Sequence, residues 1–163
     1  MTAGTIRAKR IMLTEFIEEV AAAARLAAEA RGVTFHVALL EPGMAIEADP
    51  QILAAVVTNL LQNAFKFTHP GSTVVLRVGA SPDRLLIEIE DECGGLPEAD
   101  APAPSFEQRG VDRSGLGVGL AFSRWGAEAN GGRLYSRNLP GTGCVFTVDL
   151  PRSTTPVSAP AVV

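Results

Sequence analysis

The segment from Asp49 to Thr68 constrains the fold most, because it carries a helix start, an apolar face and a helix stop. Asp49-Pro50 is a typical N-cap followed by proline at the first helical position, and Pro70-Gly71 lies just beyond the expected end near Phe67. Apolar residues recur at helical spacing between them, namely Ile52, Leu53, Val56, Val57, Leu60, Leu61 and Ala64. The sequence therefore predicts a core helix.

This helix also carries a polar row. Asn59, Asn63 and Lys66 are spaced i, i+4 and i+7, so they share one face of the helix. An Asn carbonyl oxygen can ligate a hard cation, and a Lys amine can meet a phosphate. The row indicates a site for a metal–phosphate ligand, although on this stretch alone a solvated helix face remains the alternative.

The other expected elements define the fold class. We expect a first helix from Glu15 to Arg31, with Thr14 as its N-cap and Gly32 as its stop, and a last helix from about Gly117 to Asn130. The expected strands are Val33–Leu39, Met44–Glu47, Thr73–Val78, Arg84–Glu90, Arg133–Arg137 and Cys144–Leu150. Most of the strands are joined by hairpins, and no G-x-G-x-x-G follows the first strand. The prediction is an α+β two-layer sandwich, with about three helices on a mixed, mostly antiparallel five-stranded sheet.

Composition excludes some classes of function. The 163 residues suit one domain, and a net charge of −4 argues against nucleic-acid binding. No apolar run is long enough to cross a bilayer and no signal peptide opens the chain, so we expect a cytoplasmic domain without direct membrane contact. Cys93 and Cys144 lack metal-ligand spacing and suit a reducing compartment, while a disulfide between them is left open.

Three glycine-containing segments carry further chemistry. In Asp91-Glu92-Cys93-Gly94-Gly95 an acid at a strand end could accept a hydrogen bond from an exocyclic amine, although such acids are usually turn residues. Gly115-Leu116-Gly117-Val118-Gly119-Leu120 opens a helix, where exposed N–H groups favour phosphate; a flexible loop is the alternative. Gly141-Thr142-Gly143 alone is most simply a hairpin turn.

In this order, these segments resemble the ATP-binding catalytic domain of bacterial sensor histidine kinases, within the wider family of gyrase, chaperone and mismatch-repair ATPases. The matching stretches are N-L-L-Q-N-A-F-K-F-T, D-E-C-G-G-L-P, Ser105-Phe106-Glu107, G-L-G-V-G-L and G-T-G-C-V-F-T. The resemblance covers residues 11–151 or so. It implies a Bergerat-type fold that binds ATP and Mg²⁺.

The resemblance also implies roles for individual residues. Asn63 would ligate Mg²⁺, Lys66 would contact a phosphate, Asn59 would support both, and Asp91 would read the adenine amine. Gly95 would let the purine lie close. The remaining expected nucleotide-binding residues are Phe106, Arg113, Gly115, Leu116, Gly117, Gly119, Leu120 and Thr142. Residues 97–114 would form a lid latched by Phe106, from which Arg109 and Arg113 are candidates to reach the γ-phosphate.

Two positions depart from the family pattern. Hydrolases of the wider family place a Glu where this chain has Asn59, and an amide cannot take a proton from water. Transfer to another protein group is therefore favoured over hydrolysis. Cys93 stands where a glycine is usual, which we interpret as a tolerated small side chain; an accessible thiol beside the nucleotide is the alternative.

A phosphoacceptor histidine is not evident. We interpret His36 as a strand residue and His69 as a turn residue. We expect residues 1–13 to be the remnant of a linker or dimerisation helix, 14–151 the ATP-binding domain and 152–163 a disordered tail. The expected partners are a dimerisation and histidine-phosphotransfer domain and, indirectly, a response-regulator receiver, with the isolated domain monomeric. The alternatives are a nucleotide-dependent regulatory module and an anti-sigma-type serine kinase.

Overall fold

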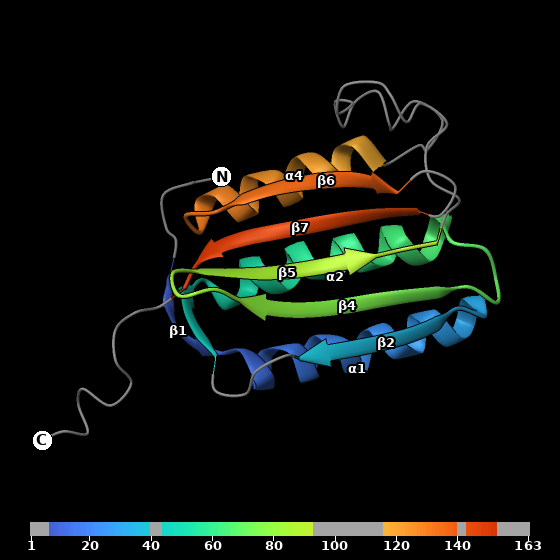
Figure 1. Ribbon diagram of the computed structural model, residues 1–163, viewed down its shortest axis with the longest axis horizontal. Coiled ribbons are helices and arrows are strands. Elements are labelled where there is room, and N and C mark those ends of the chain that lie inside the picture. Colours follow the sequence, from blue (N-terminus) through green and yellow to red (C-terminus); the bar gives the residue numbers. More distant parts are fainter. Residues whose placement is uncertain (1–6, 40–43, 93–115, 140–142, 153–163) are drawn as a thin grey trace, which may run out of the picture.

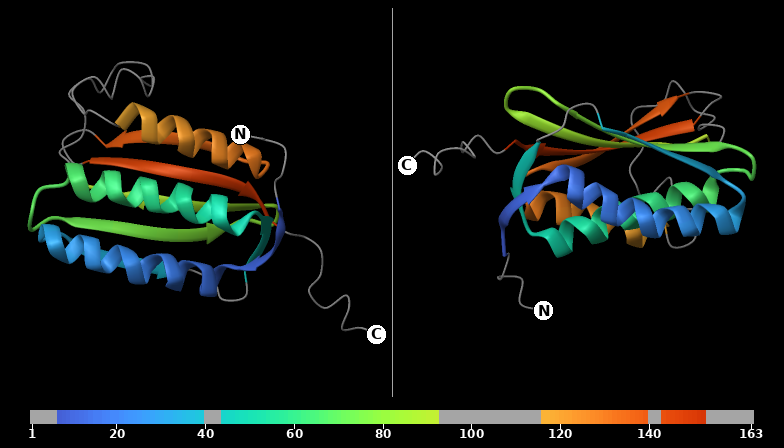
Figure 2. Two further views of the ribbon diagram at one scale, coloured as in Figure 1. Left: turned by 180° about the vertical axis from the view of Figure 1, so that it is seen from behind. Right: turned by 90° about the horizontal axis from the view of Figure 1, so that it is seen from below.

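Three helices cover one face of a five-stranded sheet in the computed structural model, which describes residues 7–39, 44–92, 116–139 and 143–152 (Figures 1 and 2). The helices are α1 (Leu13–Arg31), α2 (Pro50–Phe67) and α4 (Leu116–Ala129). The strands of the sheet are β2 (Thr34–Leu39), β4 (Thr73–Ala80), β5 (Arg84–Glu90), β6 (Arg133–Leu139) and β7 (Gly143–Pro151). The predicted α+β two-layer sandwich is confirmed.

The sheet has the strand order β2-β4-β5-β7-β6. β2 pairs with β4 in parallel, and the other three pairs are antiparallel, so the sheet is mixed as predicted. A parallel pair requires a long crossover, and α2 lies within the crossover between β2 and β4. The β5–β7 pairing brings the end of β5 beside the start of β7, with Glu90 opposite Val145.

The core lies between the helical layer and the sheet. Along β5, Leu85, Ile87 and Ile89 are fully buried, because alternate residues of a strand face the helices. Leu53 and Leu60 of α2 are buried to the same degree. Each such side chain contributes about 1.5–3 kcal/mol when removed from water. The outer face of the sheet carries charged pairs: Arg77 on β4 forms ion pairs with Glu88 and Glu90 on β5, at 3.2 and 3.0 Å.

The start of α1 differs from the prediction. Thr14 is not the N-cap, because the helix begins at Leu13 and Met12 occupies the cap position without a side-chain hydrogen bond. Leu13 is fully buried, and its backbone N–H donates to the carbonyl of Met44 at 2.9 Å. A tertiary hydrogen bond and the burial of an apolar side chain therefore set this boundary in place of a local cap.

A second, two-stranded sheet precedes α1. β1 (Lys9–Met12) pairs antiparallel with β3 (Ala45–Ala48), so that Lys9 lies opposite Ala48. The sequence does not predict β1, because four residues of mixed character give no clear strand pattern. None of the described helices has both the length and the apolar character needed to span a bilayer.

Candidate nucleotide site

The second half of α2, the end of β5 and the first turn of α4 lie at one end of the molecule (Figures 1 and 2). The packing at Gly126 explains this arrangement. A Cβ at Gly126, late in α4, would collide with Val56 and lie 3.1 Å from Ile52, early in α2. Because the late residues of one helix meet the early residues of the other, the helices are antiparallel and the start of α4 lies beside the second half of α2.

The polar row of α2 borders an open pocket. Asn59 and Asn63 are half-buried and Lys66 is exposed, as expected for one polar face of a core helix. Asn63 and Lys66 line a pocket of about 330 Å³. The other lining residues are Ala27, Arg31, Gln62 and Phe65. The Nζ of Lys66 lies 5.4 Å from the centroid of the Phe67 ring, so the aromatic ring favours a cation at this position.

Asp91 is buried and its carboxylate has a fixed orientation. It is only 4 % exposed, and its Oδ1 accepts a 3.0 Å hydrogen bond from the backbone N–H of Cys144. The backbone N–H of Asp91 donates to the Cys144 carbonyl at 2.9 Å. Two hydrogen bonds thus hold Asp91 against the start of β7, and an ionised carboxylate can accept several hydrogen bonds at once.

Gly143 permits this close approach. A Cβ at Gly143 would collide with the carbonyl oxygen of Asp91 and lie 3.0 Å from its Oδ1. Sequence reasoning treated the Gly141–Gly143 segment as a hairpin turn and missed this contact. The signal was the glycine directly before the predicted last strand, but its partner, Asp91, is 52 residues away in the sequence.

Residues 116–120 of the predicted glycine segment form the first turn of α4. Leu116, Gly117 and Gly119 lie in this turn, and Leu120 is fully buried in the core, where it supports the helix. Several of the residues given a possible role from the sequence lie outside the described ranges, namely Cys93, Gly95, Phe106, Arg109, Arg113, Gly115 and Thr142.

The start of α2, opposite the candidate site, is held by Asp49. Its Oδ1 accepts from the N–H groups of Gln51 and Ile52 at 3.0 and 3.2 Å, which confirms the predicted N-cap. Its Oδ2 accepts from the N–H of Arg7 at 2.9 Å. The hydrogen bond from Arg7 is the main cause that lowers the pKa of Asp49, and those from Ile52 and Gln51 act in the same direction against burial.

The histidines and the acidic residues add no second site among the described residues. His36 lies in β2 and His69 in the turn after α2, as expected, and both are exposed. Within the described ranges, no group of three or more His, Cys, Asp or Glu side chains could hold a metal ion. Any metal at the described part of this site would therefore need ligands of another kind, such as Asn63 and a phosphate.

Comparisons with known proteins identify a family. Residues 48–154 match the model of the histidine kinase-, DNA gyrase B- and HSP90-like ATPase family. The chain is 36 % identical over 113 residues to the circadian input-output histidine kinase CikA of Synechococcus elongatus, covering 66 % of this chain and 15 % of CikA. It is 36 % identical over 109 residues to the sensor protein TorS of Escherichia coli, covering 66 % of this chain and 12 % of TorS. The chain thus spans a small part of these relatives.

Solved structures agree with the fold. The catalytic domain of the histidine kinase ThkA superposes with a TM-score of 0.75 at 20 % identity, over 90 % of this chain and 96 % of that domain. Full-length ShkA, solved in complex with AMPPNP, superposes with a TM-score of 0.77 at 27 % identity. That match covers 94 % of this chain and 33 % of ShkA.

Proposed function

The chain belongs to the histidine kinase-, DNA gyrase B- and HSP90-like ATPase family, as a sensor histidine kinase catalytic domain, and we propose that it binds ATP with Mg²⁺ and donates the γ-phosphate to a histidine on a separate domain. The observation that carries the proposal is the buried, oriented Asp91 carboxylate at the same end of the fold as the pocket of Asn63 and Lys66. The Asp91 carboxylate suits an adenine amine, Lys66 suits a phosphate, and the amide oxygen of Asn63 suits the cation bound to that phosphate.

The residues present fit a Mg²⁺ ion that is held mainly by the nucleotide. Mg²⁺ prefers oxygen ligands, keeps several waters and is commonly bound through substrate phosphates with few protein ligands. The half-buried Asn63 supplies one amide oxygen beside the pocket, and Lys66 supplies a positive charge. When bound, the ion would neutralise phosphate charge, while Asn63 and Lys66 orient the phosphate chain.

Asp91 supports the choice of adenine. An ionised carboxylate only accepts hydrogen bonds, so it suits the exocyclic amine of adenine and not the carbonyl oxygen that guanine has at the same ring position. The N–H of Cys144 holds the Asp91 carboxylate in one orientation, so its ordering does not have to occur when the ligand binds.

Asn59 supports transfer in place of hydrolysis. Its amide has no basic lone pair at neutral pH and cannot activate water. Phosphoryl transfer needs mainly positioning and charge neutralisation, which this domain could supply without a base. The proposed acceptor is a histidine on a dimerisation domain of the same or a partner kinase, with a response-regulator receiver acting afterwards. The proposed compartment is the cytoplasm.

A nucleotide titration tests the binding part of the proposal. ATP affinity should be lost in Asp91→Asn, because the amide presents a donor as well as an acceptor, and Asp83→Asn in the exposed β4–β5 turn serves as the matched control. Asn63→Ala should weaken ATP binding in the presence of Mg²⁺ and much less in the presence of a chelator. Unchanged ATP affinity in Asp91→Asn would contradict the proposal.

A transfer assay tests the kinase part. The chain is mixed with labelled ATP and a cognate helical-hairpin domain, and the phosphorylated product is treated with acid and with base. Acid-labile, base-stable phosphate on the hairpin domain supports histidine transfer. Acid-stable phosphate would instead identify a serine kinase, and nucleotide binding without any transfer would identify a regulatory module.

A further inference from the structure

The end of α1 is fixed against the turn that follows α2. Gly32 caps α1 with a φ of 71°, and its N–H donates to the carbonyl of Glu29 at 3.1 Å. The N–H of Gly71 donates to the carbonyl of Gly32 at 2.7 Å, and the N–H of Thr34 donates to the carbonyl of Ser72 at 2.9 Å. These hydrogen bonds fix the backbone on the C-terminal side of Arg31, the last residue of α1, relative to the exit of α2.

Arg31 consequently borders the same pocket as Asn63 and Lys66. Its side chain is exposed and, among the described residues, has no carboxylate within ion-pairing distance. Because Arg31 adds a second positive charge beside Lys66, the pocket favours the binding of an anion. Its volume of about 330 Å³ lies at the lower end of small-molecule sites, so it suits one part of a nucleotide.

The position of Arg31 indicates which part of a nucleotide this pocket would bind. Asp91 lies at the end of β5, next to β7, whereas Arg31 lies on α1, which packs on the other side of α2 from α4 (Figure 2). A nucleotide whose base meets Asp91 and whose phosphates run past Asn63 would approach Arg31 with its last phosphate. Arginine is well suited to this contact, because its planar guanidinium donates two parallel hydrogen bonds to phosphate oxygens.

We propose that Arg31 is a specificity-determining residue that binds the terminal phosphate of a nucleoside triphosphate and so distinguishes ATP from ADP. This inference rests on the proposed function, because it requires ATP to bind at Asp91 and Asn63. The contact adds a charged hydrogen-bonding partner that the shorter diphosphate does not reach.

Titrations of the whole chain with ATP, ADP and AMP in excess Mg²⁺ test this inference. Arg31→Ala should weaken ATP binding about tenfold, whereas ADP and AMP affinities should change less than about twofold, given the strength of charged hydrogen bonds. Arg31→Lys should recover part of the ATP affinity, because it keeps the charge and loses the bidentate geometry. The ATP affinity of the wild type should also fall more steeply with salt than that of Arg31→Ala.

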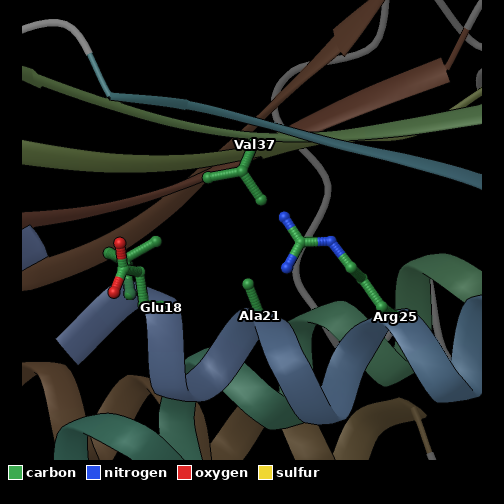
Figure 3. Close-up of a pocket in the computed structure, with 5 residues that line it drawn as sticks. Glu18, Ala21, Arg25 and Val37 are labelled. Atoms are coloured by element: carbon green, nitrogen blue, oxygen red, sulfur yellow. The ribbon is translucent and has the colours of Figure 1, made fainter. Parts of the chain in front are cut away.

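Arg25→Ala is the matched control. Arg25 lies on the same helix, but Figure 3 shows its side chain reaching toward Val37 of β2, where it lines a separate pocket of about 260 Å³. Its removal changes the net charge by the same amount, so a general electrostatic effect would appear in both variants. Thermal unfolding of each variant checks that the fold is retained.

The outcomes separate the inference from the proposed function. Equal weakening of ATP and ADP in Arg31→Ala, or an ATP affinity equal to that of the wild type, overturns the role of Arg31 while ATP binding itself stands. The same holds if Arg25→Ala weakens ATP binding as much as Arg31→Ala. If the wild type binds no nucleotide, the proposed function fails, and the inference fails with it.

Discussion

The backbone N–H of Asp49 donates a 2.8 Å hydrogen bond to Oδ1 of Asn130, a residue 81 positions later in the chain. Asn130 in turn donates from Nδ2 to the carbonyl of Gly126 at 3.0 Å, and both Asp49 and Asn130 are buried. This bond joins the start of α2 to the end of α4. The two helices that border the candidate site at one end are therefore tied together at the other.

Replacing Asn130 with Ala should destabilise the domain. The change leaves the N–H of Asp49 buried without its acceptor, which costs about 1–3 kcal/mol. Urea unfolding monitored by circular dichroism measures the change in the free energy of unfolding. Gln51→Ala, at an exposed position of α2, is the control, and a wild-type unfolding midpoint for Asn130→Ala would contradict the prediction.

Acid should weaken the domain partly through Asp49. The pKa of Asp49 is lowered in the folded state, first by the N–H of Arg7, so its ionised form stabilises the fold. This contribution is complete above the ordinary pKa of 3.8 and is lost as the pH falls through the lowered folded-state pKa. Unfolding free energies from neutral pH to about pH 3 should therefore fall less steeply for Asp49→Asn than for the wild type. An equally steep fall of the unfolding free energy in Asp49→Asn and in the wild type would contradict this role of Asp49.

Gly126 should not tolerate a larger residue. A Cβ there would collide with Val56, so Gly126→Ala should cost about 1–3 kcal/mol through overpacking between α2 and α4. Val56→Ala alone should also destabilise, because it leaves a cavity. The double variant should be more stable than the sum of the two costs predicts, which a double-mutant cycle of denaturation measurements detects. Strict additivity would show that the two positions do not interact.

Gly143→Ala should impair nucleotide binding. The added Cβ would force the start of β7 away from Asp91 and disturb the hydrogen bond that orients its carboxylate. ATP affinity should fall at least about tenfold, the equivalent of losing one charged hydrogen bond. Gly131→Ala is the control. Gly131 has a φ of 83°, which an alanine adopts only with strain, so this change should lower the stability of the fold far from Asp91 and leave the ATP affinity unchanged. Equal ATP affinity in both variants would refute the role of Gly143.

Asn59→Glu should increase ATP hydrolysis in the absence of a partner. A carboxylate at this position could take a proton from water, and a positioned general base is worth about a hundredfold or more. Release of inorganic phosphate measures the rate, and Asn59→Gln, which adds length without a base, is the control. If Asn59→Glu binds ATP but hydrolyses it no faster than Asn59→Gln, the identity of this residue does not limit hydrolysis.

Local patterns in the sequence predicted most elements of the fold. The N-cap at Asp49, the apolar periodicity of α2 and the alternation in β5 involve residues within a few positions of one another, and the structure confirms each. The same patterns missed β1 and gave the wrong N-cap for α1, because Leu13 is placed by burial and by its bond to Met44. Those interactions join segments about 30 residues apart.

The sequence by itself determined the family, the sandwich class and the polar row of Asn59, Asn63 and Lys66, because these depend on residue type and on spacing along one helix. Only the tertiary structure decided how Asp91 is oriented, since that depends on the pairing of β5 with β7 and on the absence of a side chain at Gly143. It also decided that Arg31 faces the same pocket as Lys66. The free energy of such contacts depends on geometry across the fold, which spacing along the chain does not encode.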